Sequence, residues 1–430
     1  MSFKREAFNL DAKKTPTRQG IKPNVLAARL TALSQIGRTE DDGVTRFVYT
    51  EEEKQAKALI KKWAEKAGLT LREDAAGNII GRVEGSDPTL PAVATGSHID
   101  SVKNGGAFDG ALGVLASLQA IESIIEEGHS HKRALEWLVF VNEEGSRFPT
   151  GIFGSQTMMG EVDPSSLERF VDDDGVNLAE GMKASGLDPL QIKDAKRDPA
   201  ELHAFLELHI EQGTELEETG TQIGVIKGIA GPVWLFCAFT GASDHAGNTP
   251  MGKRRDAGAA AAALTLATEE LPERFSDTAV ATVGTHALTP NSTNVVPGKA
   301  ELTIDIRDIQ KASRDALVAA IIQEGEAIAT QRNLSFSHQE LTSIDPVPVA
   351  PAMQQLLTDT AEACGYSSQS LVSGAGHDAM IIGRYVEKTA MLFVQSVKGI
   401  SHSPEEFTSV EDCVAGTAVL KEALLRLANE

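Results

Sequence analysis

The feature that most constrains the fold is a short run, residues 135–141, in which six of seven residues are apolar. Such a run is typical of a strand buried on both faces, as in a parallel sheet covered by helices. Strand-like runs at residues 78–83, 92–95 and 204–208 and a helix-like stretch at residues 110–127 accompany it. We therefore predict an α/β fold, with a mixed, mostly parallel sheet and helices on both faces.

The order of predicted elements changes near residue 230. Residues 230–344 show a β-α-β-β-α-β order, which can close as a compact α+β layer of its own. After Pro346 the first pattern resumes, with a helix predicted at residues 352–364, a strand at 389–394 and a last helix at 410–428. A chain of 430 residues is also too long for one ordinary core. We therefore predict one domain built from residues 1–229 and 345–430, with residues 230–344 inserted as a second domain.

The charge and composition of the chain exclude some kinds of binding partner and predict a cellular location. The formal charge is −21, from 61 acidic and 40 basic residues, which disfavours binding to nucleic acid. No apolar run is long enough to span a bilayer, so we expect no membrane partner. The first twenty residues lack the apolar core of a signal peptide, and the three cysteines are widely separated. These features predict a cytoplasmic location.

Polar clusters follow the predicted strands, at the ends where sites form in open α/β sheets. Residues two apart in an extended chain share a face, so Asp100 can hold one ring nitrogen of His98 while the other binds a metal ion. Eleven residues after His98, Asp109 opens a predicted helix among glycines, where its two carboxylate oxygens can bridge two cations. Taken alone, each of these features is more often structural than functional.

Two adjacent glutamates, Glu143 and Glu144, follow the run at residues 135–141. Two carboxylates beside a buried strand are costly unless a cation compensates them. Because neighbouring residues point apart, one glutamate can bind metal while the other acts as general base and passes the proton to the leaving nitrogen. His209 and His402 each lie at or just after a predicted strand. This nitrogen and oxygen ligand set, without sulfur, suits Zn²⁺, Mn²⁺, Co²⁺ or Ni²⁺.

Five motifs in order, GSHIDS, FDG, NEEGSRF, ELHIEQG and GISHSP, make the sequence similar to a known family. The chain resembles the M20 metallopeptidase-like superfamily, and within it the amidase/hydantoinase/carbamoylase branch. The resemblance covers the chain from about Val25 to the C-terminus. It implies two divalent metal ions per subunit, Zn²⁺ or Mn²⁺, with Co²⁺ or Ni²⁺ as alternatives. The implied ligands are His98, Asp109, Glu144, His209 and His402, with Asp109 bridging.

The resemblance also implies the remaining site residues. Glu143 would be the general acid/base, Asp100 would orient His98, and His245 would polarise the scissile carbonyl. The implied substrate-binding residues are Gln212, His245, Asn294, Arg307, Gly376 and His377. The inserted segment resembles the family's ferredoxin-like lid and dimerisation domain, which implies a homodimer. Asp244 departs from the small or neutral residue expected before His245, so the role of Asp244 stays open.

Several activities remain compatible with this resemblance. The first is hydrolysis of the ureido C–N bond of N-carbamoyl-L-amino acids, and the second is allantoate amidohydrolysis. Ureidoglycolate and β-ureidopropionate are further small-molecule ureido substrates of the same branch. A His in the fourth of the five motifs, where the peptidases of the superfamily usually have a carboxylate, argues against a peptidase. An inert metal-binding homologue is the remaining alternative, and the intact Glu143 argues against it.

Overall fold

The structure is a computed structural model that describes residues 4–430, so the first three residues of the predicted domain at 1–229 lie outside it. The chain divides into two compact units. The first contains Met1–Lys227, Val349–Leu371 and His377–Glu430, and the second contains Gly228–Pro348 and Val372–Gly376.

The first unit is built around a twisted sheet with the strand order β1-β2-β4-β3-β5-β15-β6. The four middle strands, β4, β3, β5 and β15, run parallel to one another, and the outer strands pair antiparallel. The mixed α/β fold with a parallel centre is therefore confirmed. The bounds are β1 Thr70–Glu73, β2 Ile79–Val83, β3 Ala92–His98, β4 Leu135–Phe140, β5 Leu202–Ile210, β6 Ile223–Ile229 and β15 Thr389–Val394.

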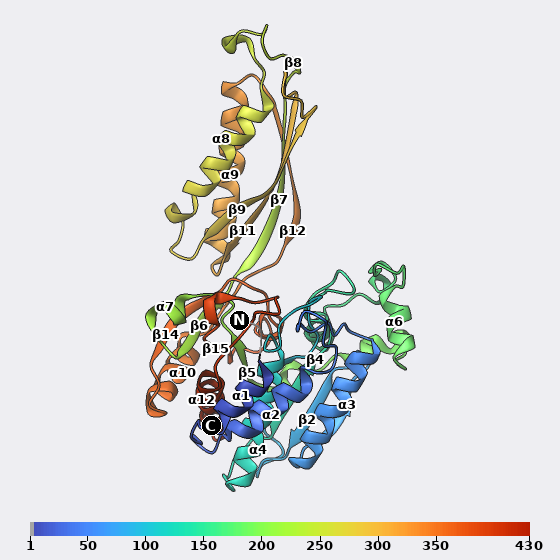
Figure 1. Ribbon diagram of the computed structural model, residues 1–430, viewed down its shortest axis with the longest axis vertical. Coiled ribbons are helices and arrows are strands. Elements are labelled where there is room, and N and C mark those ends of the chain that lie inside the picture. Colours follow the sequence, from blue (N-terminus) through green and yellow to red (C-terminus); the bar gives the residue numbers. More distant parts are fainter. Residues whose placement is uncertain (1–3) are drawn as a thin grey trace. The chain divides into compact units, whose positions relative to one another are not determined.

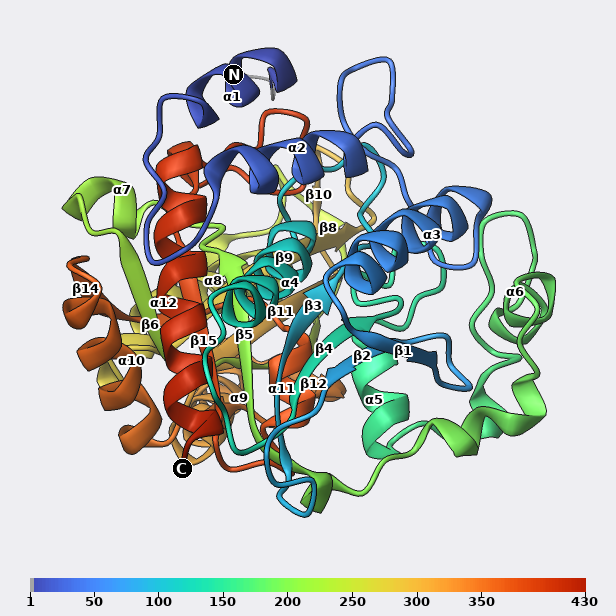
Figure 2. The same cartoon turned by 90° about the horizontal axis from the view of Figure 1, so that it is seen from below.

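Helices cover both faces of this sheet (Figure 2). On one face, α4 (Ala111–Glu126) and α12 (Val410–Ala428) lie side by side against the middle strands. Both helices are buried on most sides because further helices cover them, so most of their positions are apolar. The outer helices are α1 Arg5–Ala12, α2 Pro23–Leu33, α3 Glu51–Lys66 and α10 Pro351–Ala363.

Two short helices, α5 (Phe153–Met159) and α11 (Asp378–Ile382), pack on the opposite face. Side chains alternate along a strand, and Glu207 of β5 points away from the core that its neighbours Leu206 and Leu208 enter. The Glu207 carboxylate accepts a hydrogen bond from the backbone N–H of Ala379 in α11, which places α11 on that second face. The remaining elements of this part of the chain are α6 Leu178–Ala184, α7 Glu215–Thr219 and β14 Ser368–Ser373.

The second unit has a four-stranded antiparallel sheet in the order β12-β7-β11-β9. Helices α8 and α9 lie side by side on one face of it (Figure 1). Alternate residues of β11, such as Leu302 and Ile304, are fully buried beneath these helices, as period-two patterning requires. The bounds are β7 Gly231–Thr240, β8 Asp244–His245, α8 Ala257–Glu270, β9 Val280–Thr289, β10 Val295–Val296, β11 Lys299–Asp308, α9 Lys311–Gln331, β12 Ser335–Ser343 and β13 Val347–Pro348.

Within residues 4–430, no helix is both long and apolar enough to cross a bilayer.

Candidate metal centre

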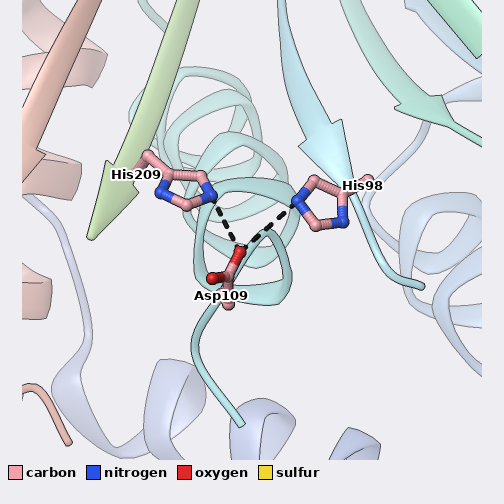
Figure 3. Close-up of side chains that lie close together, drawn as sticks. All are labelled: His98, Asp109 and His209. Carbon is pink, nitrogen blue, oxygen red and sulfur yellow. Dashed lines mark ion pairs between the residues drawn. The ribbon is translucent and has the colours of Figure 1, made fainter. Parts of the chain in front are cut away.

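Three ligand-type side chains meet where the parallel strands end. His98 is the last residue of β3, and His209 lies near the end of the neighbouring parallel strand β5. Asp109 stands just before α4 and points between the two rings (Figure 3). Its Oδ1 lies 3.1 Å from Nε2 of His209 and 3.5 Å from Nε2 of His98. All three side chains are buried.

A second group shares Asp109 with the first. Nε2 of His402 lies 3.4 Å from Oδ2 of Asp109 and 3.3 Å from Oε2 of Glu144. In each group the candidate ligand atoms lie within 4.8 Å of one another. The side chain of His402 is 51% exposed, whereas those of Asp109 and Glu144 are buried, so this group borders solvent. The two groups therefore share one carboxylate, with one oxygen facing each.

The hydrogen bonds of the two buried rings leave one nitrogen of each ring facing the centre. Nδ1 of His98 lies 3.0 Å from the backbone carbonyl of Asp100, and Nδ1 of His209 lies 3.0 Å from that of Ile210. A carbonyl only accepts, so each Nδ1 donates and each Nε2 faces Asp109, where Nε2 of His209 also accepts from the backbone N–H of Gly110 at 3.1 Å. Oε1 of Glu144 is buried and has no hydrogen-bond partner within residues 4–430. Converging lone pairs on nitrogen and oxygen fit a divalent cation.

The close approach of histidines and carboxylates also shifts the pKa values of His98 and Asp109. Burial alone would lower the pKa of His98, but the carboxylates of Glu143 and Asp109 outweigh it and raise that pKa well above its usual value. Burial acts to raise the pKa of Asp109, but His209 and the other histidines hold it well below the usual range. The centre thus attracts positive charge, whether protons or metal ions.

Asp100 and Glu143 lie beside these two groups. The Asp100 carboxylate accepts hydrogen bonds from the backbone N–H groups of Glu143 and Glu144, both at 3.2 Å. Its Oδ1 is 3.6 Å from Nδ1 of His98, so the Asp100 backbone carbonyl is the closer partner of that ring. Oε2 of Glu143 lies 3.6 Å from Nε2 of His98, and the Glu143 side chain belongs to neither ligand group.

Three residues at the centre adopt left-handed backbone conformations. The φ angles of Asn142, Gln212 and His402 are 52°, 56° and 54°. Such conformations are uncommon for side chains other than glycine and asparagine, and they concentrate at functional sites. The turn at Gln212 directs its amide to Asp109, with Nε2 donating to Oδ2 at 2.8 Å. Gln212 therefore contacts the shared carboxylate directly.

His377 is also in the first unit, next to His209. The two ring centroids are 4.5 Å apart, and His377 is buried. Burial, reinforced by His209, lowers the pKa of His377 well below its usual value, so the ring is neutral. The structure therefore brings together nine of the predicted site residues: His98, Asp100, Asp109, Glu143, Glu144, His209, Gln212, His377 and His402.

The other four predicted site residues, His245, Asn294, Arg307 and Gly376, belong to the second unit. Nδ1 of His245 accepts from the backbone N–H groups of Gly247 and Asn248 at 3.0 and 3.2 Å, so its Nε2 carries the proton and can donate. Oδ1 of Asn294 accepts from the hydroxyl of Ser292.

Arg307 forms a two-point pair with Asp305, at 2.9 and 2.8 Å. The simple alternative for Arg307, an ion pair with a neighbouring aspartate, is therefore present in this structure. The Asp244 carboxylate accepts from the backbone N–H of His245 at 2.8 Å, which is a local turn contact.

Sequence reasoning missed two residues of the centre, Ser401 and Glu406. Both contact the Asp109 turn, and Glu406 is buried. The signal available in the sequence was the acidic pair Glu405-Glu406 after the His402 motif, but the pattern alone could not separate the buried glutamate from its exposed neighbour.

Comparisons with known proteins agree with this geometry. A family model for peptidase family M20/M25/M40 matches residues 89–426. An N-carbamoyl-L-amino acid amidohydrolase of Geobacillus stearothermophilus is 41% identical over 401 residues, 93% of this chain and 97% of that protein. An allantoate amidohydrolase of Bacillus subtilis is 37% identical, covering 92% and 95%. The crystal structure of a hydantoinase/carbamoylase family amidase from Burkholderia multivorans superposes with a TM-score of 0.88 at 35% identity, covering 96% and 99%.

Proposed function

The chain belongs to the M20/M25/M40 peptidase family, and from this membership we infer that it is a metal-dependent amidohydrolase acting on N-carbamoyl-L-amino acids. The substrate would be cut at its ureido C–N bond, yielding the amino acid, CO₂ and ammonia. The observation that carries the proposal is the pair of ligand groups sharing Asp109, with Glu143 beside them and in neither. This arrangement offers metal ligands and a separate proton-transfer group.

Two divalent ions, Zn²⁺ or Mn²⁺, are the proposed cofactors. His98, Asp109 and His209 would hold one, and Asp109, Glu144 and His402 would hold the other. When bound, such ions polarise a carbonyl and lower the pKa of water to about 7. The mixed nitrogen and oxygen ligands would also accept Co²⁺ or Ni²⁺.

Glu143 would take a proton from the attacking water and deliver it to the departing nitrogen. Burial raises the pKa of Glu143 well above its usual value, only partly opposed by His98, which suits a group that must both gain and lose a proton near neutral pH. The Asp100 carboxylate would keep the Glu143 turn in place through its two backbone hydrogen bonds. Gln212 would orient the substrate with the part of its amide not engaged by Asp109.

We propose the second unit as a ferredoxin-like lid and dimerisation domain. Its β-α-β-β-α-β order and antiparallel sheet support this assignment. On it, Nε2–H of His245 would donate to the scissile carbonyl, and Asn294 and Arg307 would bind the substrate carboxylate. Arg307 is paired with the Asp305 carboxylate in this structure, so the substrate carboxylate would have to displace or share that partner. Gly376 and His377 would close the substrate pocket. The proposed homodimer would be tested by analytical ultracentrifugation.

Allantoate is the second candidate substrate, favoured by the 37% identity to the Bacillus subtilis allantoate amidohydrolase. Ammonia release from N-carbamoyl-L-methionine, allantoate and N-carbamoyl-β-alanine, measured on metal-loaded protein, separates the possibilities. We expect the highest kcat/KM on N-carbamoyl-L-methionine. Turnover of allantoate alone would move the assignment to the second candidate. No turnover of any ureido compound by fully loaded protein would favour the inert homologue.

A further inference from the structure

A glutamate that belongs to neither ligand group, Glu406, lies buried against the Asp109 turn and is 1% exposed. Its Oε1 accepts two backbone hydrogen bonds, from the N–H of Phe108 at 2.8 Å and from that of Asp109 at 3.0 Å. These contacts join residues almost 300 positions apart in the sequence. One carboxylate oxygen therefore fixes the backbone of the residue whose side chain both ligand groups share.

The other oxygen of Glu406 reaches the loop that carries His402. The hydroxyl of Ser401 lies 3.1 Å from Oε2 of Glu406 and 2.7 Å from Oδ2 of Asp109. Ser401 immediately precedes His402 in the chain. Glu406 thus connects the Asp109 turn with the His402 loop, once through the backbone and once through a serine hydroxyl.

The turn that precedes Asp109 leaves space for the Glu406 carboxylate because Gly106 has no side chain. A Cβ added to Gly106 would lie 2.0 Å from the carboxylate carbon of Glu406, so only glycine leaves room for it. The next residue, Phe407, packs edge-on against Phe108 with ring centroids 5.9 Å apart, which supports the same contact from the side. The space left by Gly106 and the packing of Phe407 on Phe108 therefore both favour the Glu406 carboxylate in its place against the turn.

Burying a carboxylate is costly unless hydrogen bonds compensate it, and here two backbone N–H groups donate to Oε1, while the Ser401 hydroxyl lies between Glu406 and Asp109. We propose that Glu406 is a positioning residue, which holds Asp109 and the His402 loop at a fixed separation before metal binds. The inference rests on the proposed metal assignment. Partners that orient metal ligands typically contribute about 10- to 100-fold to metal affinity.

The test is calorimetric titration of the metal-free protein with Mn²⁺, at a temperature where circular dichroism shows each variant fully folded. Glu406→Ala should weaken binding by about 10- to 100-fold. Glu406→Gln should recover most of that loss, because its amide oxygen still accepts the two backbone hydrogen bonds and its NH₂ can donate to Ser401. Glu405→Ala removes the exposed neighbouring glutamate and is the matched control, with unchanged affinity expected. Equal affinities in the Glu406→Ala and Glu405→Ala proteins would overturn the proposal.

A double-mutant cycle tests the same role without relying on one variant. Gly106→Ala should displace the Glu406 carboxylate and weaken Mn²⁺ binding, but it should add little in the Glu406→Ala background, where the space is free. Fully additive losses would contradict the proposal. If Glu406→Ala does not fold, Glu406→Gln and Gly106→Ala keep the test: Gly106→Ala should weaken Mn²⁺ binding more than Glu406→Gln does, and unchanged affinity in the Gly106→Ala protein would reject the role.

Failure of the proposed function would look different. An unmodified protein that binds no Mn²⁺, Zn²⁺, Co²⁺ or Ni²⁺ would reject the metal assignment itself. An unmodified protein that binds metal, combined with a silent Glu406→Ala change, would reject only the positioning role. Because the readout is metal affinity, an error in the assigned substrate leaves this test unaffected.

Discussion

Replacing Glu143 by glutamine isolates proton transfer from metal binding. The amide keeps the shape of the side chain, which is 9% exposed, and removes its charge and its ability to carry a transferable proton. The backbone N–H of Glu143 still donates to Asp100, so the turn is retained. The matched variant is Glu144→Gln, one residue along, whose carboxylate lies 3.3 Å from Nε2 of His402. The two adjacent glutamates are thus assigned different roles, with proton transfer assigned to Glu143 and metal binding to Glu144.

The expected loss of kcat in the Glu143→Gln protein follows from the position and the proposed role of Glu143. Oε2 of Glu143 lies 3.6 Å from Nε2 of His98. Glu143 belongs to neither ligand group, so its carboxylate is not needed to bind metal. A positioned general acid/base contributes about 10²- to 10⁴-fold to the rate. Because Glu143 would serve as base and then as acid, we expect a loss near 10⁴-fold in kcat, or about 5 kcal/mol in the activation free energy.

The assay combines kcat on N-carbamoyl-L-methionine with metal content by inductively coupled plasma mass spectrometry. The Glu143→Gln protein should keep the metal content of the unmodified protein and lose nearly all turnover. The Glu144→Gln protein should lose metal, chiefly from the group that contains His402. A Glu143→Gln protein with full metal content and kcat within about tenfold of the unmodified enzyme would refute the assigned base.

Three further predictions concern the ligands. Asp109→Asn should remove most bound metal from both groups, because they share that carboxylate, and retention of a full metal content after dialysis would contradict the sharing. Gly110→Ala should weaken metal binding about tenfold or more, since a Cβ there would lie 2.4 Å from the His98 ring. Gly128→Ala, also at positive φ but with nothing within 4 Å, is its control, and equal affinities would refute the steric argument. Hydrogen bonding to Asp109 raises the pKa of His402 to about 9 in the metal-free protein, so protons compete with metal below that pH. Calorimetry from pH 9 to pH 6 should show falling affinity with proton release on binding, and a constant affinity would count against His402 as a ligand.

Much of the first unit could be predicted from side-chain patterns. The predicted strand at 389–394 and helix at 410–428 have the same bounds in the structure, as β15 and α12. The strand is a continuous apolar run and the helix is mostly apolar, and burial on more than one side leaves the clearest signal in the sequence. The predicted strand at 92–95 stops short, because β3 continues to His98. Its last residues are held by pairing with parallel β4, and this pairing is not visible in the local pattern.

The contacts around the ligands were less accessible to sequence reasoning. The spacing of His98 and Asp100 predicted a carboxylate holding the ring, but the nearer partner is the Asp100 backbone carbonyl, which no residue type encodes. Glu406 and Ser401 act on Asp109 across almost 300 residues, so only the folded chain shows their proximity. The strand β6, Ile223–Ile229, was not predicted, because Gly224, Lys227 and Gly228 interrupt its apolar residues without a regular period of two.

The central claim is that Asp109 is shared by two metal ions, and anomalous diffraction tests it most directly. Crystals grown with Mn²⁺ and measured on both sides of the manganese absorption edge should show two peaks on either side of the Asp109 carboxylate. One peak should be next to His98 and His209, and the other next to Glu144 and His402. The absence of anomalous density at these side chains, or peaks that do not contact Asp109, would contradict the account.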